Sequence, residues 1–304
     1  MGARFRALTV WALALPLGAA AIGADMPAWE AGGIMASLAD AGSSSRDARR
    51  DAIAAIPLER LSAADRQSVE RGLRSATLYR RLPATTVTCS AELLDFLLAK
   101  PETIVDVWRT LGISGLSLDP AGPGQWRLAD GYGTTGLVRL VHRGRTDRGG
   151  VAVFQGRGGY EGSLSPKPLT GSCVIVVRHA AAAAAADGRP RQTVQIDAFL
   201  DVDGLGLEIV TRTLQPLIVR SAAANVHEIC LFVTQFAAAG QRNPSGIVRL
   251  TERLARTSPK DRSQLARLAC SGSSRGGGDA ADDVGPELAA RWMTAEQLEA
   301  LRIR

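Results

Sequence analysis

The chain has 304 residues, 46% of them hydrophobic, and a formal net charge of +6 at pH 7. This length and apolar content suffice to bury a sizeable core, which excludes a chain that is disordered throughout. All basic residues except Lys100, Lys167 and Lys260 are arginines, scattered through an alanine-rich chain without interleaved aromatic residues. Because nucleic-acid binding commonly uses clustered positive charge and aromatic stacking, we expect no nucleic acid among the partners.

The first residues have the layout of a secretory signal. Arg4 and Arg6 precede an apolar run from Leu8 to Leu17, and small residues follow it. This pattern predicts a signal peptide over residues 1–24 and an exported protein, either periplasmic or secreted. An uncleaved N-terminal anchor is the alternative. No later segment offers about 18 consecutive apolar residues, so we expect no stable transmembrane segment after signal cleavage.

Four cysteines follow the signal: Cys89, Cys173, Cys230 and Cys270. An oxidising compartment permits disulfides between them, but four cysteines allow three complete pairings and their spacing selects none. Buried free thiols at Cys173 and Cys230 are an equally good interpretation.

Residues 25–84 are predicted to form a spacer and a helical extension. The part from 31 to 45 is rich in Gly, Ala and Ser, which favours a flexible spacer. The segment from Leu61 to Pro83 has apolar residues at three- and four-residue steps, with Ser62 placed to cap a helix. It predicts a helix that stops at Pro83.

Two consecutive helices are predicted between residues 90 and 112. Ser90 caps the first, Pro101 suits the opening turn of the second, and Gly112 ends it. Both carry apolar stripes, so we expect them to pack on a larger core.

After Gly112 the apolar period changes from about 3.6 residues to about 2, which predicts strands. The predicted strands cover residues 113–119, 125–131, 134–144, 149–163, 169–180 and 191–204. Their connections are too short for crossover helices and favour an antiparallel sheet. The last strand alternates between apolar and polar residues, which predicts one face on a core and the other mostly toward water. By contrast, "SCVIVVR" (172–178) is apolar on both faces and predicts a doubly covered strand.

The segment from Leu205 to Gly240 predicts a long helix with one continuous apolar face. Charged residues in its other directions exclude a simple membrane span. Pro216 lacks a backbone N–H, so we expect a kink or a break there. Beyond a further amphipathic helix, residues 270–286 predict a linker without regular structure. Thr294 and Gln297 form a capping-box pattern, which predicts a short docking helix.

This order of elements predicts an α+β fold of the helix-grip (START-like) type: a curved antiparallel sheet packed on a long C-terminal helix, with an N-terminal helical extension. The helix-grip domain is predicted over residues 85–256, and a linker and short C-terminal helix over 257–304.

Four motifs carry a family resemblance: "AELLDFLLAKPETIVDVW", "DGYGTTGLVRL", "GGYEGSLSPKPLTGSCVIVV" and "FLDVDGLGLEIVTRTLQPLI". They resemble an uncharacterised family of exported bacterial proteins. More distantly, the chain from Cys89 to Leu254 resembles the START, polyketide-cyclase and birch-pollen-allergen superfamily. The distant resemblance implies a cavity between sheet and long helix for a lipid, a sterol or another apolar molecule.

The residues expected to line such a cavity lie on the strands and on the inward face of the long helix. Ser221 and Asn225 are polar positions that a cavity can use, whereas a dry core must satisfy their hydrogen bonds. Arg139 is either a cavity residue or an exposed arginine on the solvent face. The predicted ligand-binding set is Trp126, Arg139, Tyr160, Leu214, Ile218, Ser221, Asn225 and Ile229.

No complete catalytic or metal-binding signature occurs in the chain. "DGYGTTG" lacks the lysine of a phosphate-binding loop and is interpreted as a tight turn. His142 and His179 are expected to be exposed at strand ends, and the histidines share no metal-ligand spacing. His227 with Glu228 or Glu161 is the candidate for acid–base chemistry, against the alternative of a surface histidine.

We therefore expect an exported binding protein that holds an apolar or amphipathic small molecule between sheet and long helix, without metal or cofactor. The alternatives are a cyclase- or hydrolase-like enzyme on the same fold and a non-catalytic envelope scaffold protein. Because one fold hosts many functions, these alternatives are distinguished by the residues of the functional site and not by the fold.

Overall fold

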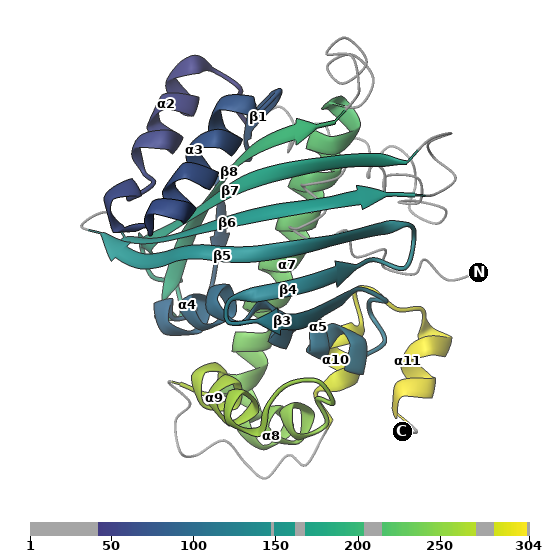
Figure 1. Cartoon of the computed structure of the whole chain (residues 1–304). Helices are drawn as coiled ribbons and strands as arrows, with labels where there is room; N and C mark the ends of the chain where they lie inside the picture. Colours follow the sequence, from purple (N-terminus) through teal and green to yellow (C-terminus); the bar gives the residue numbers. More distant parts are fainter. Residues whose placement is uncertain (1–41, 147–148, 162–167, 204–214, 272–282, 303–304) are drawn as a thin grey trace.

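The computed structural model describes residues 42–146, 149–161, 168–203, 215–271 and 283–302, except for the side chains of residues 146, 215–221 and 302. Within these ranges the chain is an α+β protein built on a curved antiparallel sheet of eight strands. Helices cover both faces of this sheet (Figure 1).

Strands β3 to β8 form a meander in which each strand pairs with the next. The strand order is β1-β8-β7-β6-β5-β4-β3, and β2 also pairs with β8. Every pairing is antiparallel, which confirms the prediction from the short connections. The strands are β1 (Leu78–Arg81), β2 (Thr85–Val87), β3 (Ser117–Gly122), β4 (Gln125–Ala129), β5 (Thr134–Thr146), β6 (Gly149–Tyr160), β7 (Leu169–Ala182) and β8 (Arg191–Val202).

Two N-terminal helices, α2 (Arg46–Ala54) and α3 (Ala63–Ser75), precede the sheet, with a short 3-10 turn, η2 (Leu58–Arg60), between them. The Ser62 hydroxyl accepts a hydrogen bond from a first-turn backbone N–H and caps α3, as predicted. The prediction that this helix continues to Pro83 is wrong, because Leu78–Arg81 pair with β8 as β1. In a strand, Leu78 and Tyr79 point to opposite faces, and each joins a different apolar core.

The sheet separates two apolar cores, which we call the inner core and the outer core. In β6, Phe154 belongs to the inner core, which α5 and α7 share, and Val153 belongs to the outer core, which α2 and α3 close. Strand β7 contributes to both, as its doubly apolar sequence predicted. The prediction that the second face of β8 mostly meets water is wrong: Asp197 and Phe199 are 0% exposed there, under the N-terminal helices.

A buried carboxylate joins the outer face to α2. Asp197 accepts hydrogen bonds from the Tyr79 hydroxyl (2.8 Å), Arg81 Nε (2.7 Å) and Arg178 Nη2 (2.8 Å). Both arginines also bind Asp51 of α2, at 2.7 and 3.1 Å. Burial and the hydrogen bond to Asp197 raise the pKa of Tyr79, which keeps its hydroxyl a donor.

Helices α4 (Ala91–Ala99) and α5 (Pro101–Thr110) connect β2 to β3. Ser90 caps α4 and Pro101 opens α5, as predicted. Gly112 follows α5 with a φ of 74°, a left-handed conformation that glycine adopts without strain.

The long helix α7 (Gln215–Arg242) crosses behind the sheet in Figure 1. Pro216 is the second residue of the described helix, and the residues before it lie outside the description, so the predicted kink or break there stays a prediction. The start of the predicted helix, residues 205–214, lies outside the described residues, and so does most of the predicted linker 270–286.

Four shorter helices follow: α8 (Pro244–Glu252), α9 (Pro259–Ala269), α10 (Gly285–Ala289) and α11 (Ala295–Arg302). Thr294 and Gln297 exchange backbone-to-side-chain hydrogen bonds of 2.9 and 3.3 Å, which confirms the predicted capping box. Among the helices that the structure describes, none is long and apolar enough to cross a membrane.

The inner core continues across the predicted domain boundaries. Leu78, before residue 85, and Leu265 and Leu288, after residue 256, belong to the same apolar cluster as Phe236 of α7. The C-terminal helices therefore pack as part of the same core as the sheet and are not an appended unit.

All four cysteines are free thiols. Cys89, Cys173 and Cys230 are buried, and burial raises the pKa of each thiol to about 12. Cys270 is half-buried, and burial raises its pKa as well. The structure thus agrees with the interpretation of buried free thiols.

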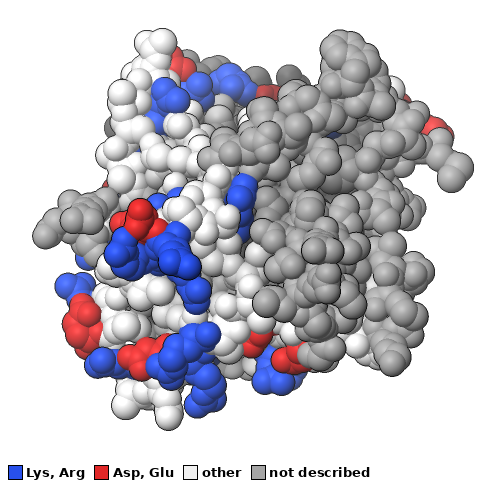
Figure 2. All heavy atoms as spheres, turned by 90° about the horizontal axis from the view of Figure 1, so that it is seen from above, with Lys and Arg blue, Asp and Glu red and all other residues white. Residues whose placement is uncertain are grey.

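On the face of the molecule that Figure 2 shows, the basic side chains do not form one continuous patch. In Figure 2, Lys and Arg lie in separate groups, several of them beside Asp or Glu. Arg66 pairs with Glu70, and Arg178 pairs with Asp51.

Candidate functional site

The inner face of the sheet carries two of the predicted ligand-binding residues. Trp126 of β4 and Tyr160 of β6 are each 2% exposed. Trp126 belongs to the inner core, and Tyr160 follows Phe154 by six residues, which places it on the same face of β6. These two side chains are therefore on the side of the sheet that α5 and α7 cover.

Arg139 lies on the opposite face. Its guanidinium pairs with Asp65 of α3 and donates to Gln155 Oε1 at 2.8 Å, and Gln155 in turn donates to Ser68 of α3. The prediction that Arg139 lines a cavity against the long helix is wrong, because strand alternation turns its side chain toward the N-terminal helices. Its side chain is 35% exposed beside α3, which agrees in part with the alternative of an exposed arginine.

The described part of α7 brings Asn225 and Ile229 onto one stripe with Phe232 and Phe236. Steps of four, seven and eleven residues return to the same helix face, and both phenylalanines belong to the inner core. Asn225 is 6% exposed. Outside the description lie Leu214 and the side chains of Ile218 and Ser221.

A row of glycines crosses the same face of the sheet. Gly158 of β6 stands opposite Gly136 of β5 and Gly171 of β7, and Gly156 lies two residues before it. Two-residue alternation from Phe154 assigns all four to the inner face. Glycine removes the side chain from this part of the sheet, which lets the strands bend and lets another group approach the backbone.

The candidate acid–base residues do not form a dyad. The carboxylate of Glu228 accepts two hydrogen bonds of 2.8 Å from Arg291 and one of 3.1 Å from Trp292 Nε1. Glu228 therefore docks the C-terminal segment and does not orient His227. Glu161 is exposed at the end of β6, where its backbone N–H donates to Gly133.

The other histidines differ from their predicted exposure. His179 is 3% exposed, and its Nε2 lies 3.0 Å from Asp95 Oδ1 of α4. His142 is half-buried, and burial lowers its pKa. Within the described ranges, no group of three His, Cys, Asp or Glu side chains is arranged to hold a metal ion.

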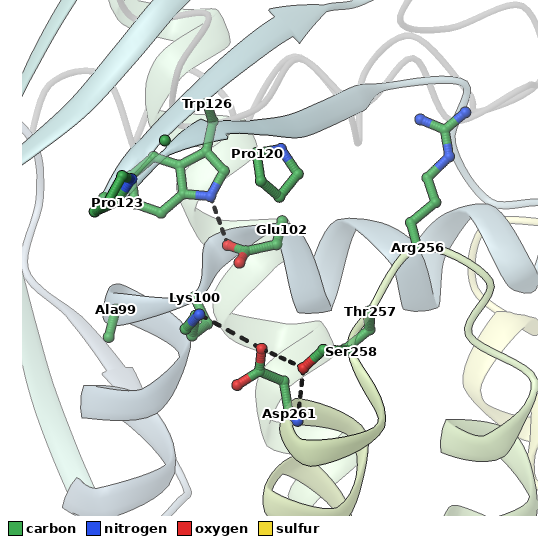
Figure 3. Close-up of a pocket in the computed structure, with 12 residues that line it drawn as sticks. Ala99, Lys100, Glu102, Pro120, Pro123, Trp126, Arg256, Thr257, Ser258 and Asp261 are labelled. Atoms are coloured by element: carbon green, nitrogen blue, oxygen red, sulfur yellow. Dashed lines mark hydrogen bonds and ion pairs between the residues drawn. The ribbon is translucent and has the colours of Figure 1, made fainter.

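A separate pocket of about 210 Å³ opens between the α4–α5 junction, the β3–β4 hairpin and the start of α9 (Figure 3). Its apolar wall comes from the hairpin and is formed by Pro120, Pro123 and Trp126. Its charged wall comes from the helices and includes Lys100, Glu102 and Asp261.

Helix capping explains why acidic residues stand at this pocket. Glu102 lies in the first turn of α5, and Asp261 in the first turn of α9, where Ser258 caps the helix. A carboxylate in a first turn is stabilised by the positive end of the helix dipole. The two helix starts point into the same space, so both carboxylates reach it.

Hydrogen bonds hold each carboxylate in place. Trp126 Nε1 donates to Glu102 Oε2 at 2.7 Å, whereas Ser258 Oγ donates to Asp261 Oδ2 at 2.8 Å and Lys100 Nζ lies 3.4 Å from the same oxygen. Burial raises the pKa of Glu102, and the negative charge of Asp261 adds to this effect, against the opposing hydrogen bond of Trp126.

The ligand-binding residues predicted from the sequence include Trp126 but not Lys100, Glu102 or Asp261. Locally, these residues look like ordinary helix-start residues, and 159 positions separate Glu102 from Asp261 (261 − 102). The charged pair that flanks Pro101 was the available local signal, and it does not point to a pocket by itself.

No family model matches the sequence, and no curated protein matches it either. The function is therefore inferred from the arrangement of the chain's own residues.

Proposed function

We propose that this chain is an exported binding protein with a helix-grip fold, which holds an apolar or amphipathic small molecule between the inner face of its sheet and α7. Apolar side chains would supply most of the binding free energy, at roughly 25 cal/mol per Å² of buried apolar surface before ordering costs. A few polar groups would orient the molecule.

The order of elements supports the helix-grip assignment. The helix pair α4 and α5 stands between the first strands and the meander, and the long helix follows the last strand. The first and last strands, β1 and β8, lie side by side in the sheet. This is the order expected of a sheet that curves around a long C-terminal helix.

Asn225 is the observation that carries the binding proposal. Asn225 is a buried polar side chain on the apolar stripe of α7, and burial of an amide costs free energy unless it is hydrogen-bonded, so a dry core usually has an apolar residue at such a position. A ligand with a polar group would satisfy this amide and make use of it. The glycines of β5, β6 and β7 support the same assignment, because at these positions the inner face carries no side chain.

The enzyme alternative has less support, since both oxygens of Glu228 bind Arg291 or Trp292 and leave His227 without a carboxylate partner among the described residues. The scaffold alternative gives no role to the buried polar side chain of Asn225.

The test is the identification of small molecules that remain bound when the protein is purified from its own host, by native mass spectrometry followed by organic extraction. We expect an apolar or amphipathic molecule in stoichiometric amount. A ligand-free protein that also shows no saturable uptake of a fluorescent fatty acid would overturn the proposal.

Variants on α7 sharpen this test. Asn225→Leu keeps the volume but removes the polar contact, and it should weaken retention, whereas His227→Ala, two positions later, should retain the molecule. Thermal unfolding of both variants shows whether they fold. If folded Asn225→Leu and the wild type retain the same molecule equally, Asn225 does not orient it.

A further inference from the structure

We propose that the pocket between the β3–β4 hairpin and the starts of α5 and α9 is a second binding site, which takes a small organic molecule bearing one ammonium group on a short apolar body. This inference does not rest on the proposed site at α7, because the two regions share no residue except Trp126, whose indole N–H is turned to Glu102.

The charges of the pocket favour a cation. Figure 3 shows the carboxylates of Glu102 and Asp261 facing the same space, with Lys100 to one side. Two carboxylates and one ammonium leave a formal charge of −1. Arg256 also lines the pocket, but its guanidinium points away from both carboxylates in Figure 3 and pairs with Asp119, which is not a lining residue.

The hydrogen-bonding capacity of the pocket also favours a donor. A carboxylate offers about four acceptor positions. Glu102 accepts one side-chain hydrogen bond, from Trp126, and Asp261 accepts from Ser258 and Lys100. Acceptor positions therefore remain on both carboxylates, and an ammonium group brings three donors to fill them.

The environment of the Glu102 carboxylate also favours a cationic ligand. The start of α5 and the charge of Lys100 both stabilise its carboxylate, yet burial and Asp261 keep its pKa above the ordinary value. A ligand cation would remove this imbalance and lower the pKa of Glu102 on binding.

The apolar wall and the volume limit the rest of the molecule. Pro120, Pro123 and Trp126 offer a surface for a flat or short aliphatic body, and an indole also attracts a cation near its face. A space of about 210 Å³ accommodates a body of one ring with a short arm. Longer acyl chains do not fit.

Benzylamine, protonated at neutral pH, is a suitable probe, and benzyl alcohol and benzoate have nearly the same shape with neutral and negative groups. Titration of the full chain, followed by calorimetry, should show benzylamine binding at least about tenfold more tightly than either analogue. Equal or tighter binding of benzyl alcohol or benzoate would overturn the proposal, and so would the absence of saturable benzylamine binding up to about 10 mM.

Charge variants locate the binding. Glu102→Gln keeps an acceptor for Trp126 and should weaken benzylamine at least about tenfold, whereas Glu92→Gln removes an exposed charge of α4 outside the pocket and should leave the affinity unchanged. Lys100→Met should increase the affinity for benzylamine, because it removes a competing cation. Asn225→Leu should leave the affinity for benzylamine unchanged, because Asn225 does not line this pocket. If Glu102→Gln folds and binds benzylamine like the wild type, the assigned site is wrong.

Discussion

Nε of Arg81 lies 2.7 Å from Oδ1 of Asp197, and this contact joins the edge strand β1 to β8 at a carboxylate whose side chain is 0% exposed. Arg178 binds the second oxygen of the same carboxylate from β7. Two arginines on one buried aspartate, both also held by Asp51, form a charge network that connects three strands to α2.

Removal of Asp197 should therefore destabilise the protein strongly. Asp197→Ala leaves two arginine charges without their shared buried partner, and loss of one member of a buried pair costs about 3–5 kcal/mol. Chemical denaturation of the variant and the wild type measures the difference. The exposed pair of Asp187 with Arg189 provides the control, since Asp187→Ala should change the unfolding free energy far less.

Glu102 should make stability depend on pH. Because burial and Asp261 raise its pKa in the folded protein, the folded state binds the proton more tightly than the unfolded chain does. The contribution of Glu102 to the free energy of unfolding is therefore most favourable below its pKa in the unfolded chain, about 4.3. This contribution is lost as the pH rises through the pKa of Glu102 in the folded protein. Glu102→Gln should gain stability relative to the wild type between about pH 4 and pH 7.

Urea denaturation at the two pH values measures this change. A constant difference between Glu102→Gln and the wild type across that interval would contradict the prediction.

Glu228 should hold the C-terminal segment on α7. Glu228→Ala removes the paired hydrogen bonds to Arg291 and the bond to Trp292, and for a partly exposed ion pair the expected loss is about 1 kcal/mol. Hydrogen exchange in α10 and α11 should accelerate by roughly fivefold, while the sheet keeps its protection. His227→Ala is the matched control; similar acceleration in both variants would mean that Glu228 has no docking role.

The cysteines should differ in reactivity. Burial raises the pKa of Cys89, Cys173 and Cys230 to about 12, so these thiols hold almost no thiolate at neutral pH. Cys270 is half-buried and should be the first to react with iodoacetamide, as peptide mass spectrometry after a short exposure would show. Early labelling of Cys173 would indicate that the sheet opens locally.

Much of the fold follows from local pattern. The caps at Ser62 and Ser90, the opening of α5 at Pro101 and the capping box of Thr294 and Gln297 are each set by contacts within a few residues, so a sequence reading can find them. The strand period and the short connections likewise suffice for an antiparallel sheet.

The errors share one cause. Leu78–Arg81 have an acceptable helical pattern, but the open edge of β8 satisfies their backbone groups better than another helical turn would. Arg139 and Asp197 look like solvent-face residues of strands, and only the position of the N-terminal helices turns that face into an interior.

By itself, the sequence determined the types of the elements from α4 to β8 and the doubly covered strand β7, because short-range hydrogen bonding and apolar period decide these. The tertiary structure alone decided which strand edge received β1, which face α2 and α3 cover, and that Glu102 and Asp261 meet beside Trp126. Most of these contacts join positions far apart in the sequence, and their free energies depend on the whole packed arrangement, which no local pattern contains.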